Sequence, residues 1–428
     1  MNSRLVIKAI LIGSLLLFHT VFSENRDSIG DINNDGVINV QDIVRIVNII
    51  LQNDLPPTEY EQWAGDVNND DIIDVTDIII IVNYILGTGI LCDEGYSFCP
   101  GSITECCADV TSHYLEWAID TLGALGLYSD LFDAAIINDS VTWVVGAIYL
   151  NGEFYNAASW DGENWEMHQI AGSNSEFRGI FAFSEEDIWM TPAIPIHFED
   201  GEWVVYNLWQ MGILGQEDGP LTKIWGVSPS DVYFIGNLGT IVHYDGSEFS
   251  RIESGTNVNL YSITGSGPND VWISGENLSI GENRTTLLHY DGMNVEIILE
   301  GPASSEYEDN MISGAIKGVY TDIADSIWVT THLGMYKCAS STTGEGELLS
   351  GSENWGASIN TISGNTHNDI FIAGDFSTIW HYNGIGFHQY EELLYESQTW
   401  GIVTDQNTVC AVGFLATTAQ ALILIGNR

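Results

Sequence analysis

A motif that recurs across residues 111–428 constrains the fold more than any other feature of this sequence. In each copy an acidic or polar residue precedes an apolar residue and a large aromatic one, and the last copy is degenerate. The equivalent positions are Trp143, Trp189, Tyr233, Trp272, Trp328, Phe371 and Cys410, with spacings of 39 to 56 residues. A sustained period of this length indicates seven structural repeats, which a β-sandwich would not need.

Two other sequence elements recur with the same period as this motif. Asp-Gly or Asn-Gly dipeptides follow it and favour β-hairpin turns, because both turn residues need positive φ. These turns begin at Asp161, Asp200, Asp245, Asp291 and Asn383. Apolar segments with small residues, such as 224–227, precede the motif and suit a strand near a crowded axis. Four short strands per repeat predict an all-β seven-bladed propeller over residues 111–428.

The two ends of the array must meet if the ring is to close. The last repeat ends after its third strand, at 421–425, so its fourth strand has to come from elsewhere. Residues 114–119 have strand character and precede the first repeat, and we expect them to complete the last blade and remove its free edge. The turn dipeptide is missing at 335–341, which indicates one blade with a different turn.

A second pattern, of two loop-helix units, occupies residues 28–88. Calcium is bound in proteins by hard oxygen ligands, and a 12-residue loop supplies them from positions 1, 3, 5, 7, 9 and 12. The first loop offers Asp31, Asn33, Asp35, the Val37 carbonyl, Asn39 and Asp42, and the second offers Asp66, Asn68, Asp70, the Ile72 carbonyl, Asp74 and Asp77. We expect two calcium ions, with the second site weaker because position 6 is Asp71 instead of glycine.

These paired loops, which end in Asp at position 12, resemble the type I dockerin family over about 60 residues. The resemblance implies a small all-α module that calcium stabilises and that docks on a cohesin domain, often in carbohydrate-degrading systems. It also implies partner contacts at loop positions 10 and 11, which are Val40, Gln41, Val75 and Thr76. A cohesin-like or other extracellular protein is therefore the expected partner.

The repeat array resembles, in pattern only, seven-bladed propellers of the sialidase-like and photosystem-assembly-factor type. The Asp-box of sialidase blades is absent, and the arginines of the array are too few and scattered for a sialidase triad: Arg178, Arg251, Arg284 and Arg428. The loops 277–284 and 304–311 are long enough to build a binding site. No catalytic or cofactor-binding residue is predicted.

The N-terminus and the cysteines both indicate export. Residues 1–23 have the basic start and apolar stretch of a signal peptide, which predicts a protein secreted by a bacterium or held at its surface. Residues 89–110 form a connector in which we expect Cys92 and Cys99 to pair with Cys106 and Cys107, since adjacent cysteines rarely bridge each other. A metal site there is less favoured, because zinc-type spacing is missing. Cys338 and Cys410 should be free and buried.

The formal net charge of −48 argues against nucleic-acid and peripheral membrane partners, because such a surface repels phosphates and anionic lipids. Four histidines recur at one repeat position, and this recurrence favours structural over catalytic roles: His197, His243, His289 and His381. Two functions stay open. The propeller either binds an extracellular glycan or protein, with the calcium module serving attachment, or degrades polysaccharides as a glycoside hydrolase or lyase.

Overall fold

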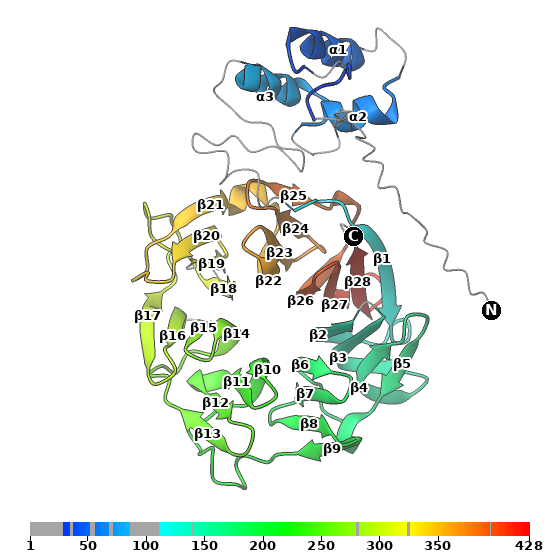
Figure 1. Cartoon of the computed structure of the whole chain (residues 1–428). Coiled ribbons are helices and arrows are strands. Elements are labelled where there is room, and N and C mark those ends of the chain that lie inside the picture. The colour runs from blue at the N-terminus through cyan, green and yellow to red at the C-terminus, as the bar shows by residue number, and fades with distance from the viewer. Residues whose placement is uncertain are drawn as a thin grey trace, which may run out of the picture. The chain divides into compact units, whose positions relative to one another are not determined.

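The computed structural model describes residues 29–34, 37–51, 56–67, 72–85, 111–138, 140–279, 282–322, 326–393 and 395–428. The chain divides into two compact units, Met1–Ala108 and Asp109–Arg428 (Figure 1). Each unit is described by itself below. The proposed signal peptide and the connector cysteines Cys92, Cys99, Cys106 and Cys107 lie outside the described residues.

The N-terminal unit is helical, as expected. Its helices are α1 (Val40–Ile50), α2 (Glu59–Gly65) and α3 (Val75–Ile85). Helices α1 and α3 pack against each other around a buried cluster of small and branched apolar residues: Ile29, Ile32, Ile46, Ala64, Val67, Ile80 and Ile81. Capping boxes begin α1 at Asn39 and α2 at Thr58, so the backbone N–H groups exposed at these helix starts are satisfied.

The C-terminal unit is a ring of seven four-stranded antiparallel sheets, which confirms the propeller (Figure 1). Blade 1 consists of β2 (Asp130–Asn138), β3 (Val141–Leu150), β4 (Glu153–Trp160) and β5 (Trp165–His168). Blade 2 consists of β6 (Gly179–Ser184), β7 (Asp187–Thr191), β8 (Ile196–Glu199) and β9 (Glu202–Val205). Blade 3 consists of β10 (Leu221–Ser228), β11 (Asp231–Gly236), β12 (Ile241–Tyr244) and β13 (Phe249–Ile252). Blade 4 consists of β14 (Leu260–Gly267), β15 (Asp270–Ser279), β16 (Glu282–Tyr290) and β17 (Val295–Pro302). Blade 5 consists of β18 (Ile316–Thr321), β19 (Ser326–Thr331), β20 (Gly334–Ala339) and β21 (Glu347–Gly351). Blade 6 consists of β22 (Ile359–Thr366), β23 (Asp369–Gly374), β24 (Ile379–Tyr382) and β25 (Phe387–Gln389). Short 3₁₀ helices interrupt the connections at Ile170–Gly172, Asn237–Gly239, Ser352–Asn354 and Glu391–Leu393.

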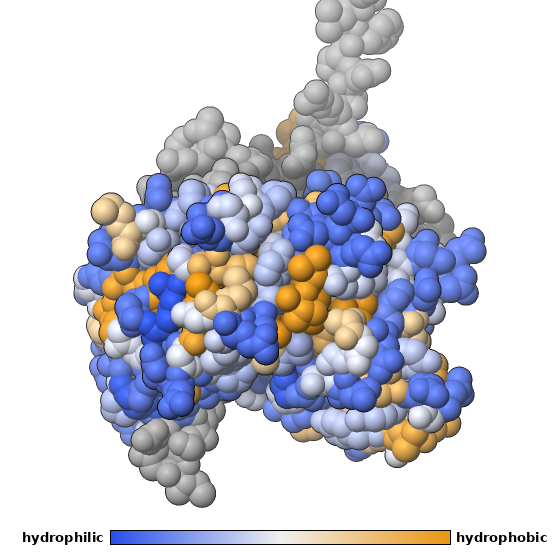
Figure 2. All heavy atoms as spheres, turned by 90° about the horizontal axis from the view of Figure 1, so that it is seen from below, coloured by the Kyte–Doolittle hydropathy of each residue, from blue (hydrophilic) through white to orange (hydrophobic). Residues whose placement is uncertain are grey.

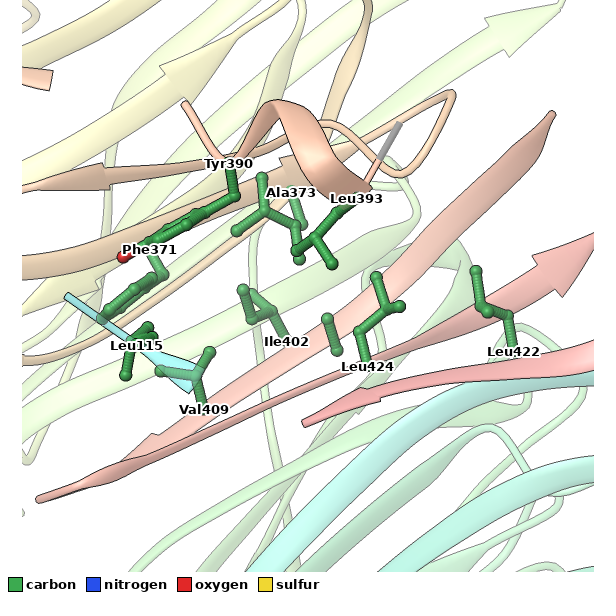
Figure 3. Close-up of a cluster of buried hydrophobic side chains, with 11 residues drawn as sticks. Leu115, Phe371, Ala373, Tyr390, Leu393, Ile402, Val409, Leu422 and Leu424 are labelled. Atoms are coloured by element: carbon green, nitrogen blue, oxygen red, sulfur yellow. The ribbon is translucent and has the colours of Figure 1, made fainter. Parts of the chain in front are cut away.

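The last blade closes the ring with a strand from the other end of the array. It contains β26 (Ser397–Asp405), β27 (Thr408–Leu415), β28 (Gln420–Asn427) and, outermost, β1 (Glu116–Leu122). Strand β1 pairs antiparallel with β28, from Glu116 opposite Asn427 to Leu122 opposite Ala421. The predicted closure is confirmed, although the strand begins two residues later than expected. Leu115, just before β1, is buried beside Phe371 and Val409 in the core between blades 6 and 7 (Figure 3).

The recurring histidines belong to a packing unit that is repeated from blade to blade. Each places Nε2 2.6 to 2.9 Å from the aspartate of the motif: His197 on Asp187, His243 on Asp231, His289 on Asp270 and His381 on Asp369. Each imidazole also stacks on the motif aromatic, with ring centroids 3.7 to 4.5 Å apart. In blade 5 Lys337 replaces the histidine and lies over Trp328. These contacts agree with a structural role.

Small residues in the inner strands let neighbouring blades approach closely. A Cβ on Gly179 of β6 would lie 2.8 Å from the Thr222 carbonyl oxygen and 3.1 Å from the Lys223 Cα of the next inner strand. Only glycine fits that approach without a backbone shift. On the side that Figure 2 shows, hydrophilic residues predominate and hydrophobic residues form separate patches.

The seam that closes the ring should be acid-labile. His113 Nδ1 lies 2.9 Å from His381 Nδ1, and burial, followed by the charges of His381, His388 and Arg428, lowers the pKa of His113 to about 2. Burial likewise lowers the pKa of His381, against the opposing effect of Asp369. The unfolded chain therefore takes up these protons first, and stability should fall as pH drops below about 6.5, by roughly 1.4 kcal/mol per pH unit for His113 alone.

Thermal unfolding of the propeller between pH 8 and pH 5 measures this effect. The melting temperature should be flat down to about pH 7 and then decline, and His113→Asn should make the decline shallower. An unchanged pH profile in that variant would show that the acid sensitivity arises elsewhere.

Candidate functional site

The first predicted calcium loop is closed by its position-12 carboxylate. Asp42 Oδ1 accepts the Asn33 backbone N–H at 3.2 Å and Asp42 Oδ2 accepts the Asn39 backbone N–H at 2.8 Å. Helix α2 supports the same loop, because the Tyr60 hydroxyl donates to the Asp31 carbonyl oxygen at 2.8 Å. Of the predicted ligands in this loop, Asp35 lies outside the described residues.

The second loop is closed by its position-12 carboxylate in a similar way, although one of the two donating N–H groups stands at position 2 instead of position 3. Asp77 Oδ1 accepts the Val67 backbone N–H at 2.9 Å, and Asp77 Oδ2 accepts the Asp74 backbone N–H at 2.8 Å. Asn68, Asp70 and Asp71 lie outside the described residues, whereas Ile72 is described. Each of the two predicted loops is therefore closed by its position-12 aspartate.

The chemistry of the described ligands suits calcium. Asp31, Asp42, Asp66 and Asp77 are all buried, although the unit is small. Burying carboxylates is costly unless positive charge compensates them, and carboxylate and carbonyl oxygens are the ligands that calcium prefers. Asp31 and Asp42 of the first loop, and Asp66 and Asp77 of the second, would hold the ions together with Asn33, Asn39, Asp74 and the Val37 and Ile72 carbonyls.

The predicted partner-binding positions lie at equivalent places in the two loop-helix repeats of the N-terminal unit. Val40 and Val75 are the first residues of α1 and α3, and both side chains are exposed, by 62% and 60% respectively. Gln41 and Thr76 follow them and are also exposed. Two exposed apolar residues at helix starts in a small domain are available for a protein contact.

The two cysteines of the propeller are free and buried, as predicted. Burial raises the pKa of both the Cys338 and Cys410 thiols to about 12. At neutral pH both are therefore protonated and unreactive, because the thiolate is the nucleophile. They do not contribute a catalytic site.

A cavity of about 1370 Å³ lies at the centre of the ring and is lined by the inner strand of every blade. One residue near the start of each inner strand contributes to its wall: Phe132, Arg178, Thr222, Tyr261, Lys317, Asn360 and Trp400. We call these residues the bulge ring. In six blades this residue falls at a register shift between the inner strand and its neighbour, and Arg178 directly precedes β6. A β-bulge redirects the side chain of its extra residue, which explains how such different residues converge on one opening.

Two lysines in the cavity wall form ion pairs with carboxylates of other blades. Lys223 Nζ lies 2.6 Å from Asp133 Oδ1, and the other Asp133 oxygen accepts the Ile180 backbone N–H at 3.1 Å. Lys317 Nζ lies 2.5 Å from Glu276 Oε1. Burial raises the pKa of the Glu276 carboxyl, and Lys317 opposes that rise. Cross-blade pairs of this kind hold the inner strands in place and give the cavity a polar, mixed-charge wall.

Exposed aromatic side chains gather at the end of the ring where the bulge ring lies. In an antiparallel blade, the turn between the second and third strands and the link to the next blade share one end. Seven of the eight exposed aromatic residues in the described propeller lie at that end: Tyr128, Tyr149, Trp209, Tyr261, Tyr307, Phe376 and Tyr395. The eighth, Tyr114, precedes β1 at the opposite end. We call the aromatic-rich end the aromatic face.

Of the two long loops expected from the sequence, only one lies on this face as a loop. Residues 304–311 connect β17 to β18 and expose Tyr307. Residues 277–284 are instead mostly strand, because β15 and β16 extend as a long hairpin. Sequence reasoning missed the bulge ring, although five of its seven members directly precede a small or hydroxyl-bearing residue: Arg178, Tyr261, Lys317, Asn360 and Trp400.

Comparisons with known proteins agree with the division of the chain into a small helical unit and a propeller. Residues 29–86 match the family model of the Dockerin type I domain, which spans both loops and all three helices. These residues are a dockerin domain. Dockerin domains in general bind calcium, typically bind cohesin partners and occur in extracellular bacterial proteins. A search of curated proteins found no match to the chain.

The propeller is similar in fold to many solved structures. YCF48 bound to a D1 peptide matches 75% of this chain and 98% of its own, with a TM-score of 0.55 and 15% identity. Virginiamycin B lyase from Staphylococcus aureus matches 72% of this chain and 99% of its own, with a TM-score of 0.52 and 12% identity. PorZ, a surface component of the type-IX secretion system of Porphyromonas gingivalis, matches 78% of this chain but only 50% of its own, with a TM-score of 0.51 and 11% identity.

At these identities the likeness shows the fold alone. The similar structures include a lyase and proteins that are not described as enzymes, so the fold does not decide whether this propeller is catalytic. None of the helices in the described residues is long and apolar enough to cross a membrane.

Proposed function

We propose that this chain is a secreted binding protein, whose propeller holds an extracellular glycan or protein on its aromatic face. The dockerin domain attaches it to a cohesin-like partner and carries two calcium ions. The bulge ring is the observation that carries the proposal, because its seven side chains, six of them at register shifts, line one cavity at the end of the ring that also exposes the aromatic residues. A cavity with convergent aromatic and polar groups is the usual form of a ligand site.

The composition of the bulge ring supports binding of a large polar ligand. Tyr261 and Trp400 offer apolar surfaces, whereas Arg178 covers one face of the Phe132 ring. Asn360 Oδ1 and Thr222 Oγ1 are hydrogen-bond acceptors, since the Asn360 amide N–H and the Thr222 hydroxyl already donate within the propeller. Aromatic residues with polar neighbours give contact area together with orientation, which glycans and peptides both need. The YCF48 structure with a bound peptide supports the possibility that such a propeller accepts a protein segment.

Tyr261→Ala should weaken binding to the propeller's ligand without changing its stability. The Tyr261 side chain is 46% exposed at the cavity opening, and its hydroxyl accepts a hydrogen bond from Asn259 Nδ2 at 3.2 Å. Loss of one stacked aromatic should lower affinity by roughly tenfold. Retention of the protein on immobilised polysaccharides and on extracellular protein extracts measures the effect.

Tyr114→Ala is the matched control for this experiment. Tyr114 is another exposed tyrosine whose hydroxyl hydrogen-bonds within the chain, but it lies at the opposite end of the ring. The proposal expects full retention of this variant. Equal losses for both variants, or no retention of the unaltered protein on any of these materials, would contradict a binding role for the aromatic face.

Polysaccharide cleavage by a glycoside hydrolase or lyase is the second candidate. Two carboxyls with raised pKa values support it. Burial raises the pKa of Asp130 to about 6, against opposing hydrogen bonds from Tyr128 and Trp400, and Glu276 lies in the cavity wall. The pKa of Asp130 suits a general acid near neutral pH, although Asp130 itself is buried, accepts hydrogen bonds from Trp400 of the bulge ring and does not line the cavity. Release of reducing ends in the same screen, abolished by Asp130→Asn or Glu276→Gln, would favour cleavage, and retention without release would favour binding.

A further inference from the structure

A second, smaller pocket opens on the aromatic face, away from the central cavity. Its volume is about 440 Å³, within the ~300–1,000 Å³ of typical ligand pockets. Its walls come from the link between blades 5 and 6, the β23–β24 turn of blade 6 and the link between blades 6 and 7. The central cavity and this pocket have no lining residue in common.

One wall of the pocket is an aromatic side chain held on a constrained turn. Phe376 is 57% exposed and has a φ of 61°, and the next residue, Ser377, has a φ of 52°. Consecutive non-glycine residues in the left-handed region are unfavourable and persist only where surrounding contacts enforce them. The Phe376 N–H donates to the Ser397 carbonyl oxygen at 2.7 Å, and the Tyr395 N–H donates to the Phe376 carbonyl oxygen at 3.1 Å. The ring is therefore presented on a fixed backbone.

The same turn in blade 3 shows what is particular to blade 6. There Leu238 has a φ of 58° and Gly239 a φ of 73°, so the second left-handed position is a glycine, which adopts it without strain. Blade 6 keeps a serine at that position and places an aromatic ring at the tip. The turn in blade 3 borders the central cavity only through Asn237.

Residues with polar side chains line the same pocket as Phe376. Gln389, Tyr395 and Glu396 line it, and no hydrogen bond of their side chains occurs within the described part of the chain. Trp355 also lines the pocket and is buried, and its indole N–H already donates to Ser350 Oγ at 3.1 Å. The pocket therefore offers an amide, a phenol and a carboxylate next to an exposed aromatic face.

This combination fits a neutral sugar ring. The C–H face of a pyranose packs on an aromatic ring, while its hydroxyl groups need both donors and acceptors, which an amide, a phenol and a carboxylate supply. No lysine or arginine lines the pocket, so an anionic ligand would meet Glu396 without a compensating charge. A purely apolar ligand would leave the polar groups buried without partners.

We propose that this pocket is a subsite for one ring of a neutral glycan, with Phe376 as the stacking platform and Gln389 and Glu396 as hydrogen-bonding groups. The inference deepens the proposed function and rests on it, since it selects glycan over protein as the ligand of the aromatic face. It also places one contact of that glycan outside the central cavity.

Saturation-transfer NMR on the full calcium-loaded chain tests the proposal with four soluble probes: cellohexaose, xylohexaose, mannohexaose and laminarihexaose. At least one of them should bind, and Phe376→Ala should weaken its binding by roughly tenfold. Gln389→Ala, which removes only an amide from the pocket wall, should weaken it as well. Leu238→Ala, at the same turn position in blade 3, is the matched control and should bind like the unaltered chain.

The outcomes separate this inference from the proposed function. Binding that survives Phe376→Ala and Gln389→Ala but is lost in Tyr261→Ala would overturn the pocket and leave the aromatic face as the binding site. If none of the four probes binds while the chain is retained on a protein extract, the glycan assignment is wrong and the proposed function stands. Because Gln389 lies outside the strained turn, loss of binding in both variants with unchanged melting temperatures would support the pocket independently of folding.

Discussion

Removal of calcium should unfold the dockerin domain and leave the propeller folded. The small core of the domain is built around its loops, because Ile32 and Val67, next to the predicted ligands Asp31 and Asp66, pack with Ile46 and Ile81 of the helices. Without a cation, the buried carboxylates of each loop repel one another and the loops should open. A unit of this size has too little core to fold without such support, so the binding energy of the ion becomes folding energy.

Circular dichroism and calorimetry during a chelator titration measure this result. Two thermal transitions are expected, and only the one assigned to the dockerin domain should move or vanish. A far-ultraviolet spectrum of the isolated residues 24–110 that did not change on chelation would defeat the calcium assignment.

Single and paired substitutions sharpen the assignment. Asp31→Ala combined with Asp66→Ala should reproduce chelation, because each change removes the position-1 ligand of a loop. Asp31→Ala alone should cost more than Asp66→Ala alone, since the first loop keeps the glycine at position 6 and should hold its ion more tightly. Gln62→Ala, an exposed change on α2 outside both loops, is the control and should leave the transition unchanged.

The architecture was predictable because the packing unit itself repeats. The motif aspartate, the motif aromatic and the following histidine form one hydrogen-bonded stack, so the residues that the blade core needs recur in the sequence. Where the unit changes, as with Lys337 over Trp328 in blade 5, the aromatic position still marks the blade. The need to remove a free edge predicted the closing strand in the same way.

The sites on the propeller were not predictable by the same reasoning. Members of the bulge ring share a backbone position but differ in chemistry, from Phe132 to Arg178 to Asn360, so no residue pattern marks them. Their convergence depends on bulges, which are visible only in the strand register. The smaller pocket draws Trp355, Phe376 and Tyr395 from three separate connections, and their proximity follows from the ring and not from local sequence.

The calcium loops stand between these two cases. Spacing alone was enough to predict the proposed calcium ligands, because an EF-hand type loop is a local structure whose geometry is fixed by the order of its residues. The structure adds the closure of each loop by Asp42 and Asp77, which the sequence could not supply.

A chain that begins at Thr121 should lose the integrity of the propeller. It lacks nearly all of β1, which covers the outer edge of blade 7 from Glu116 to Leu122. It also loses Leu115 from the core between blades 6 and 7 (Figure 3). Trp117, which packs on that core, is lost as well. Burial of one such side chain stabilises by ~1.5–3 kcal/mol, so losing both with the strand pairing removes a large share of the ~5–15 kcal/mol that keeps a domain folded.

Solubility and melting temperature of this shortened chain, compared with a chain that begins at Thr111, measure the effect. The shortened chain should melt at a lower temperature and aggregate, since blade 7 would present β28 as an unpaired edge. Leu115→Ala in the longer chain should cost ~2–5 kcal/mol on its own, whereas Tyr114→Ala, one residue earlier and exposed, should cost little. If the shortened chain proved as soluble and as heat-stable as the longer one, closure of the ring would not depend on β1.

Rescue in trans separates loss of the strand from general damage. A synthetic peptide of residues 111–122 should bind the shortened chain by pairing with β28 and should restore its melting temperature, because the missing strand is contiguous and lies at an edge. The same peptide with Leu115 and Trp117 changed to alanine can still pair through its backbone but cannot fill the core between the blades. It should therefore bind more weakly and rescue less, which would show that side-chain burial, and not strand pairing alone, closes the ring.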